Sequence, residues 1–302
     1  MIKGLIHPGI TVSSLENTLS FFRDVFGLAD SRSQVSDQPY LSKVTGLENA
    51  ALKIGFVRFP ERSFPLEVIE YTHPKGEKLI GGEGVPGTPY IAFETDDLDA
   101  FTYAASAMRV KFLHSSDNSP LEGKENLHKA VFYGPDGIQM EVLENPGKKG
   151  GGRVNRIHHL SLTVSDMGDA LDLLCGKLGL IMNTSSNEED LYPPARIQAE
   201  KDEIYGKSST RILAIPGSDA IVELIAYKDP AGQPANAAHN NPGSMHLCFQ
   251  VEDIFQVHAD LEKSGVRFVG PPVMVTAGIN HGAYAVYFEG FDGFRFEIFQ
   301  KP

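Results

Sequence analysis

Four residues whose side chains could bind a metal or transfer a proton lie in apolar stretches, where such side chains are unexpected. They are His159, Glu223, His246 and Glu297. Glu223 interrupts the segment IVELIAY, and Glu297 interrupts RFEIF. An ionised carboxylate inside such a strand is costly unless it is paired, hydrogen-bonded or bound to a metal. Two imidazoles and two carboxylates around one divalent cation would meet this need, and mixed nitrogen and oxygen ligands suit zinc, nickel, cobalt, manganese or iron.

These residue types recur because the chain repeats internally. The segment HPGITVSSLENTLSFFRDVFGL begins at His7 and matches HLSLTVSDMGDALDLLCGKLGL, which begins at His159. Each predicts a strand, an amphipathic helix and a glycine that ends the helix. A second pair begins at Pro89 and Met245, and each member ends in two strands around the turn GPDG or GFDG. We therefore predict four modules, each with a strand, a helix and about three further strands.

The first half of the chain carries a less complete set of candidate ligands, namely His7, Glu67, Tyr90 and Glu141. Glu67 precedes Glu223 by 156 residues (223 − 67), and Tyr90 precedes His246 by the same interval (246 − 90). Because tyrosine takes the place of one histidine, we expect the first half to hold either a weak metal site or a structural remnant of one.

Alternation along a strand separates the candidate ligands from the predicted core. In HLSLTV, the side chains of Leu160 and Leu162 share one face, and His159 lies on the other. In HLCFQV, Leu247 and its apolar neighbours likewise face away from His246. Both histidines are therefore expected to face away from the packed helices, on the free side of a sheet.

Bulk properties limit the classes of partner. The chain has 302 residues, 41% of them hydrophobic, and a formal net charge of −12, which argues against nucleic acid and anionic membrane surfaces. No apolar run is long enough for a membrane span, and we expect no signal peptide. Two cysteines are too few for a disulfide framework and suit the cytoplasm. We expect a cytoplasmic protein that acts on a small molecule, and a homodimer is left open.

The βαβββ repeats, the histidines of first strands and the glutamates of last strands resemble the vicinal oxygen chelate superfamily. This superfamily includes glyoxalase I, methylmalonyl-CoA epimerase, extradiol dioxygenases, and fosfomycin and bleomycin resistance proteins. The resemblance covers nearly the whole chain and implies an α+β fold of two tandem domains, in which two modules form a cupped sheet. Residues 1–146 would carry the degenerate site and residues 153–302 the metal site.

The pairing of the modules decides which ligands meet. The linker-like stretch GKKGGGR, residues 147–153, favours pairing of the third and fourth modules. The metal ligands implied by the resemblance are then His159, Glu223, His246 and Glu297. Some relatives instead pair the first module with the fourth, and that pairing would assemble His7, Glu67, His246 and Glu297.

Four ligands leave two positions open on an octahedral ion, which suits a bidentate α-hydroxy-carbonyl or thioester-carboxylate substrate. We therefore predict a glyoxalase I-type or epimerase-type lyase or isomerase that acts through a metal-stabilised enediolate, with Glu223 and Glu297 as acid–base residues.

One alternative is an extradiol ring-cleaving dioxygenase at iron(II), which needs only two histidines and one carboxylate. The segment INHGAYAVYFEGFDGFRFE resembles its signature, with His281 as a supporting histidine. A metal-free drug-binding protein is a third reading.

Overall fold

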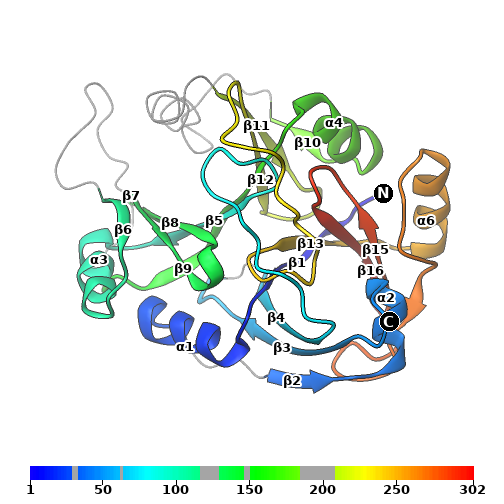
Figure 1. Ribbon diagram of the computed structural model, residues 1–302, viewed down its shortest axis with the longest axis horizontal. Coiled ribbons are helices and arrows are strands. Elements are labelled where there is room, and N and C mark those ends of the chain that lie inside the picture. Colours follow the sequence, from blue (N-terminus) through cyan, green and yellow to red (C-terminus); the bar gives the residue numbers. More distant parts are fainter. Residues whose placement is uncertain (29–32, 62–63, 116–128, 146–149, 184–207) are drawn as a thin grey trace.

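The computed structural model describes residues 1–28, 33–61, 64–115, 129–145, 150–183 and 208–302 (Figure 1). The first module contains β1 (Gly4–Thr11), α1 (Leu15–Phe26), β2 (Ser33–Ser36), α2 (Pro39–Thr45), β3 (Ala51–Val57) and β4 (Leu66–His73). The second contains β5 (Pro89–Thr95), α3 (Leu98–Ala107), β6 (Phe112–Ser115), β7 (Lys129–Tyr133), the 3₁₀ turn η1 (Pro135–Gly137) and β8 (Gln139–Glu144).

The second half repeats this plan. The third module contains β9 (Val154–Thr163), α4 (Met167–Leu171) with its π-helical continuation η2 (Asp172–Lys177), β10 (Ile181–Met182), β11 (Ser208–Ala214) and β12 (Ile221–Tyr227). The fourth contains β13 (Met245–Gln250), α6 (Ile254–Lys263), β14 (Val273–Met274), β15 (Tyr284–Glu289) and β16 (Arg295–Gln300). The predicted α+β fold of four βαβββ modules is confirmed.

The strands form two mixed eight-stranded sheets that each combine one module from each half of the chain. Sheet A has the order β14-β15-β16-β13-β1-β4-β3-β2 and joins the first and fourth modules. Sheet B has the order β10-β11-β12-β9-β5-β8-β7-β6 and joins the second and third. At each centre two first strands run antiparallel, β1 beside β13 and β5 beside β9 (Figure 1).

The expectation that the third and fourth modules pair to form one cupped sheet is therefore wrong. The stretch 147–153, of which only residues 150–153 are described, separates two strands of the same sheet, because β8 ends at Glu144 and β9 begins at Val154 in sheet B. The backbone N–H of Gly152 donates to Asp96 Oδ1 at 2.9 Å and fastens this connection to the second module. The longer connections, residues 74–88 and 228–244, carry the chain between the sheets.

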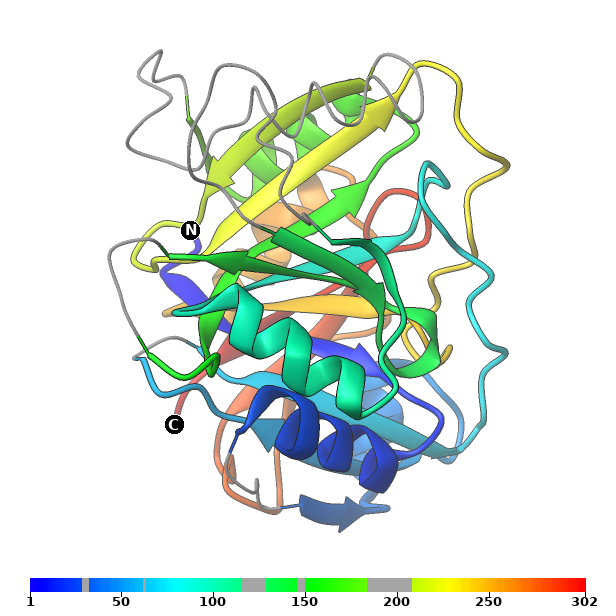
Figure 2. The ribbon, with the colours of Figure 1, turned by 90° about the vertical axis from the view of Figure 1, so that its left-hand side faces the viewer.

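The main apolar core draws on all four modules and lies on the helix-bearing faces of the sheets. Phe26 of α1 contacts Phe93 of β5 and Phe101 of α3, with ring centroids 4.8 and 5.7 Å apart, so a helix of sheet A packs against sheet B. Figure 2 shows α1 and α3 side by side. Along β13, Leu247 enters this core and His246 points to the opposite, concave face, as the alternation predicts.

Two aspartates in hairpin turns connect the sheets to each other. Asp136, in the GPDG turn of sheet B, accepts a hydrogen bond of 2.7 Å from the backbone N–H of Ser13, where the chain enters α1 of sheet A. Asp292, in the GFDG turn of sheet A, accepts one of the same length from Ser165, where the chain enters α4 of sheet B. Both aspartates have left-handed backbones, with φ of 56° and 48°, a conformation that aspartate tolerates better than most residues.

None of the helices in these described ranges is long and apolar enough to cross a membrane. Cys175 and Cys248 are both free thiols.

We expect Asp136→Ala to lower the free energy of unfolding by about 1–2 kcal/mol, because it removes the hydrogen bond to Ser13 and a residue suited to the left-handed backbone. Urea denaturation measures the change. Asp136→Asn keeps an oxygen acceptor and the backbone preference, so its loss should be less than half as large. Equal losses in the two variants would show that the hydrogen bond contributes nothing.

Candidate metal centre

The concave face of sheet A brings four buried ionisable side chains together at its centre: His7, Glu67, His246 and Glu297. His7 Nε2 lies 3.3 Å from Glu67 Oε2 and 3.8 Å from Glu297 Oε2. His246 Nε2 lies 3.5 and 3.7 Å from the same two oxygens. Each imidazole therefore faces both carboxylates, and all four groups point to one place.

Strand order explains this convergence. The central strands β1 and β13 supply the histidines, and the flanking strands β4 and β16 supply the glutamates. Gly9 of β1 is opposite Glu67 in the parallel ladder and opposite His246 in the antiparallel ladder. Because Gly9 lies two residues after His7, the three side-chain positions share one face.

The set predicted from the consecutive pairing is split between the sheets. His246 and Glu297 lie in sheet A, whereas His159 and Glu223 lie in sheet B, where His159 Nε2 is 3.6 Å from Glu223 Oε2. The groups of three or more ligand-type side chains found in the described part of the chain all belong to sheet A. The alternative pairing gives the observed quartet, so His7 and Glu67 take the places expected for His159 and Glu223.

Burial and mutual charge shift the pKa values of the quartet apart. Burial raises the pKa of Glu297 to about 7, although the nearby His7 opposes this shift, and the neighbouring Glu67 adds to it. Burial also lowers the pKa of His246 to about 3. Against the effect of burial, the pKa of His7 is raised by Glu67 and that of Glu67 is lowered by His7. Without a cation, the site therefore favours the ionised form of Glu67 and raises the pH at which Glu297 loses its proton.

The donor set fits a divalent metal. His7 Nε2 is buried without a hydrogen-bond partner among the described residues, and it faces two carboxylate oxygens. Two imidazole nitrogens and two carboxylate oxygens form a common coordination set for zinc, nickel, cobalt, manganese and iron. His7, Glu67, His246 and Glu297 are the residues that would hold such an ion.

Several neighbours of the quartet were not predicted. The Tyr287 hydroxyl lies 3.2 Å from His246 Nε2, and the ring of His239 packs on Tyr287 with centroids 5.1 Å apart. The Cys248 thiol lies close to His7 and Glu297, and burial raises its pKa. Cys248 lies two residues after His246 in β13, so alternation along the strand puts both side chains on one face. His239 lies in the connection 228–244, outside the repeated modules, so the repeat gave no signal for it.

A cavity of about 80 Å³ on the concave side is lined by His7, Glu67 and Glu297 of the quartet. Its walls are mainly aromatic and aliphatic, with Phe56 and Ile54 from β3, Phe299 from β16 and residues of α2. Gln34 and Asn280 contribute carboxamides to the lining. His281, which the resemblance to dioxygenases marked as a supporting residue, is exposed beside this lining and is not part of it.

The concave face of sheet B has a related but altered arrangement. His159 and Glu223 keep their predicted proximity, and the Ser161 hydroxyl donates to Glu223 Oε2 at 2.6 Å. Tyr90 lies where sheet A has His246, and Lys129 Nζ is 3.8 Å from Glu141 Oε1. The expectation of an incomplete set therefore applies to sheet B, which contains Tyr90 and Glu141, and not to His7 and Glu67.

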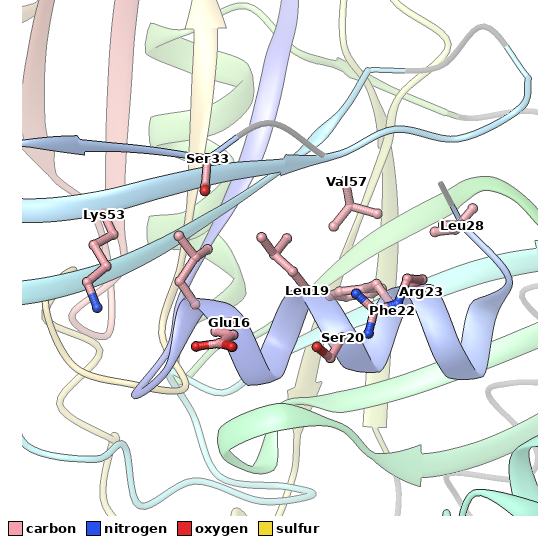
Figure 3. A pocket seen from close by; sticks show the side chains of 10 residues that line it. Glu16, Leu19, Ser20, Phe22, Arg23, Leu28, Ser33, Lys53 and Val57 are labelled. Carbon is pink, nitrogen blue, oxygen red and sulfur yellow. The ribbon is translucent and has the colours of Figure 1, made fainter. Parts of the chain in front are cut away.

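A larger hollow, of about 500 Å³, lies between α1 and β3, away from the quartet (Figure 3). Its charged lining is already paired in part, because Lys53 Nζ lies 2.9 Å from Glu70 and Arg23 Nε lies 2.9 Å from Asp24. It holds none of the four candidate ligands.

Comparison with known proteins agrees with this architecture. The family model described as Glyoxalase/Bleomycin resistance protein/Dioxygenase superfamily matches residues 4–142 and 156–298. The structure is similar to that of glyoxalase I from Zea mays, with a TM-score of 0.67 and 16% identity over 98% of this chain and 92% of that chain. It is also similar to a putative dioxygenase from Bacillus subtilis subsp. subtilis str. 168, with a TM-score of 0.61 and 13% identity over 100% of this chain and 86% of that chain. No curated protein matches the sequence.

We expect His7→Ala to lower metal affinity at least tenfold, because it removes one of four ligands, and His159→Ala to leave affinity unchanged, because that imidazole lies in sheet B. Elemental analysis after dialysis and titration with Co²⁺ measure both variants, which form a matched pair from equivalent strands. Loss of metal in His159→Ala, with retention in His7→Ala, would contradict the location of the centre.

Glu297→Gln should change the pH dependence of stability in the metal-free protein. An acid whose folded pKa is raised, here from 4.5 to about 7, contributes stability that is present below the unfolded pKa and lost as pH rises through the folded pKa. Glutamine does not titrate, so the stability of the variant relative to the parent should rise by roughly 2–3 kcal/mol between pH 5 and pH 8. Chemical denaturation with a chelator measures this difference, and a difference that does not vary with pH would contradict the prediction.

Proposed function

We propose, because the chain belongs to the Glyoxalase/Bleomycin resistance protein/Dioxygenase superfamily, that it is a divalent-metal-dependent isomerase or lyase of the glyoxalase I or epimerase type. Its substrate would be a small carbonyl compound with two oxygen atoms that can bind side by side. The observation that carries this proposal is the buried quartet of His7, Glu67, His246 and Glu297.

The number of candidate ligands favours this chemistry. A metal held by four protein groups keeps two octahedral positions for substrate, and when bound it would act as a Lewis acid that makes a neighbouring C–H more acidic. The chain itself supplies the groups that move the proton. Glu67 and Glu297 come from the two flanking strands, β4 and β16, so their carboxylates approach the centre from opposite sides.

A carboxylate on each side suits a proton transfer that begins and ends on different carbons or different faces. One glutamate, loosely held by the metal, would accept the proton at a carboxylate oxygen from the carbon beside the carbonyl group, and the other would return it. We assign Glu67 and Glu297 to these two roles together. Glu223, which was expected to share this work, lies in sheet B and takes no part.

The cavity walls would favour the same reaction by limiting water. Phe56, Ile54 and Phe299 cover the approach to the carboxylates, so a proton held on either glutamate would exchange slowly with bulk solvent. Gln34 and Asn280 are placed to hydrogen-bond polar groups of a bound substrate. These residues would orient the substrate without supplying charge.

Ring cleavage by an extradiol-type dioxygenase is the alternative from the same superfamily. That reaction needs a metal with three protein ligands and three open positions. Glu67 Oε2 lies 3.3 Å from His7 Nε2 and 3.5 Å from His246 Nε2, which favours its role as a fourth ligand. His281 lies exposed outside the cavity lining, which removes one reason for the dioxygenase reading. A metal-free binding protein is disfavoured by the cost of burying the quartet without a cation. A cytoplasmic location and a homodimer stay predictions.

The activity can be tested on protein loaded with each candidate metal and supplied with methylglyoxal–thiol adducts, methylmalonyl-CoA or catechols. We expect turnover of a carbonyl substrate with solvent deuterium partly excluded from the product. Glu67→Gln and Glu297→Gln should each lower kcat at least 100-fold at saturating metal, because a carboxamide accepts no proton.

The matched control is Glu223→Gln, the equivalent change in sheet B, which should keep full activity. Oxygen-dependent ring cleavage that requires iron(II) would replace this proposal with the dioxygenase. Absence of stoichiometric metal would argue for a binding protein.

A further inference from the structure

Sheets A and B present the same backbone register at their centres but different side chains. In sheet A, Gly9 of β1 faces His246 of β13. In sheet B, Ser161 of β9 faces Tyr90 of β5 at the equivalent place. Each of these central residues is also paired with the glutamate of its own module, Gly9 with Glu67 and Ser161 with Glu223.

The absence of a side chain at Gly9 is what admits the second imidazole of sheet A. A Cβ atom at this position would lie 2.0 Å from Cε1 and 2.7 Å from both nitrogens of His246. Contacts this short do not occur, so a side chain at residue 9 would force the buried imidazole of His246 out of its observed position. The ring of His246 can therefore reach Glu67 and Glu297 only across a glycine.

Sheet B lacks this opening. Ser161 places a Cβ where sheet A has none, and its hydroxyl donates to Glu223 Oε2 at 2.6 Å. Tyr90 takes a different course, because its ring packs with Ile225 and Tyr227 and its hydroxyl lies 3.5 Å from the carbonyl oxygen of Gly82. The Tyr90 side chain therefore contacts Ile225, Tyr227 and Gly82, and it offers no imidazole nitrogen to the glutamates of sheet B.

In sheet B, the ammonium group of Lys129 takes the place of a metal beside Glu141, the counterpart of Glu297. Lys129 of β7 is paired with Leu143, and Ala285 of β15 is paired with Phe299, so the two residues are equivalent. Lys129 Nζ lies 3.8 Å from Glu141 Oε1, the counterpart of Glu297. The ammonium group offsets the charge of this carboxylate without any bound ion.

We propose that one position on the central strand decides which sheet can hold a metal. This position is Gly9, opposite His246, in sheet A and Ser161, opposite Tyr90, in sheet B. Sheet B keeps a ligand-type residue at three of the four positions, namely His159, Glu223 and Glu141. In sheet B, Ser161 prevents the binding of a divalent cation. Tyr90, which replaces a histidine, and Lys129, which pairs with Glu141, add to this effect. This inference rests on the proposed metal centre of sheet A.

The test transfers the sheet A residues to sheet B in the full-length protein: Tyr90→His, Ser161→Gly and Lys129→Ala together. Metal content by elemental analysis and the d–d absorption of bound Co²⁺ should rise from one to two ions per chain. The critical control is Tyr90→His with Lys129→Ala and Ser161 retained, which should stay at one. The converse variant, Gly9→Ala, should lose the sheet A ion with at least a tenfold loss of affinity.

Each result has one meaning. A second ion in the triple variant and not in its control supports the inference. A triple variant that is folded by circular dichroism and binds one ion, or a control that already binds two, overturns it. If Gly9→Ala does not fold, the triple variant and its control decide alone. A wild-type protein with no ion would instead contradict the proposed function, and a wild-type protein with two would contradict the closure of sheet B.

Discussion

The antiparallel pairing of β1 with β13 is the interaction on which the candidate centre depends. It joins strands that lie more than 230 residues apart, from Gly4 opposite Gln250 to Ile10 opposite Met245. The ladder brings His7 and His246 to one face, and the parallel neighbours β4 and β16 add their glutamates beside them. Four side chains that are costly to bury separately thereby become a single site that a cation can neutralise. The helices, the cavity and the hairpins are arranged around this pair of strands.

Much of the fold could be read from the sequence because the repeats are local. The spacing of apolar residues in each module predicts its strand and helix, and alternation separates His246 from Leu247. Glutamates inside apolar strands also pointed to the kinds of side chain that meet at the candidate centre. The pairing of the modules could not be predicted in the same way. It depends on contacts between distant strands and not on any local pattern. The glycine-rich stretch 147–153 suggested a boundary, whereas the strands that precede and follow it both belong to sheet B.

The residues that distinguish the two sheets were the hardest to predict. Gly9 has no side chain to attract attention, yet its importance lies in the space that it leaves for His246. Ser161 in the matching position looks like an ordinary strand residue until its contact with Glu223 is known. Because steric exclusion acts between neighbouring strands, it becomes visible only after the register is fixed.

The exchange of turn aspartates between the sheets ties sheet B to the sheet that holds the candidate centre. Asp136 of sheet B holds the entry to a helix of sheet A, and Asp292 of sheet A does the same for sheet B. A break in the connection 147–153 would leave two pieces, each with half of both sheets and two uncovered strand edges. Neither piece would own a full ligand set. The chain is therefore the covalent equivalent of a heterodimer, in which each half supplies two of the four residues of the candidate centre.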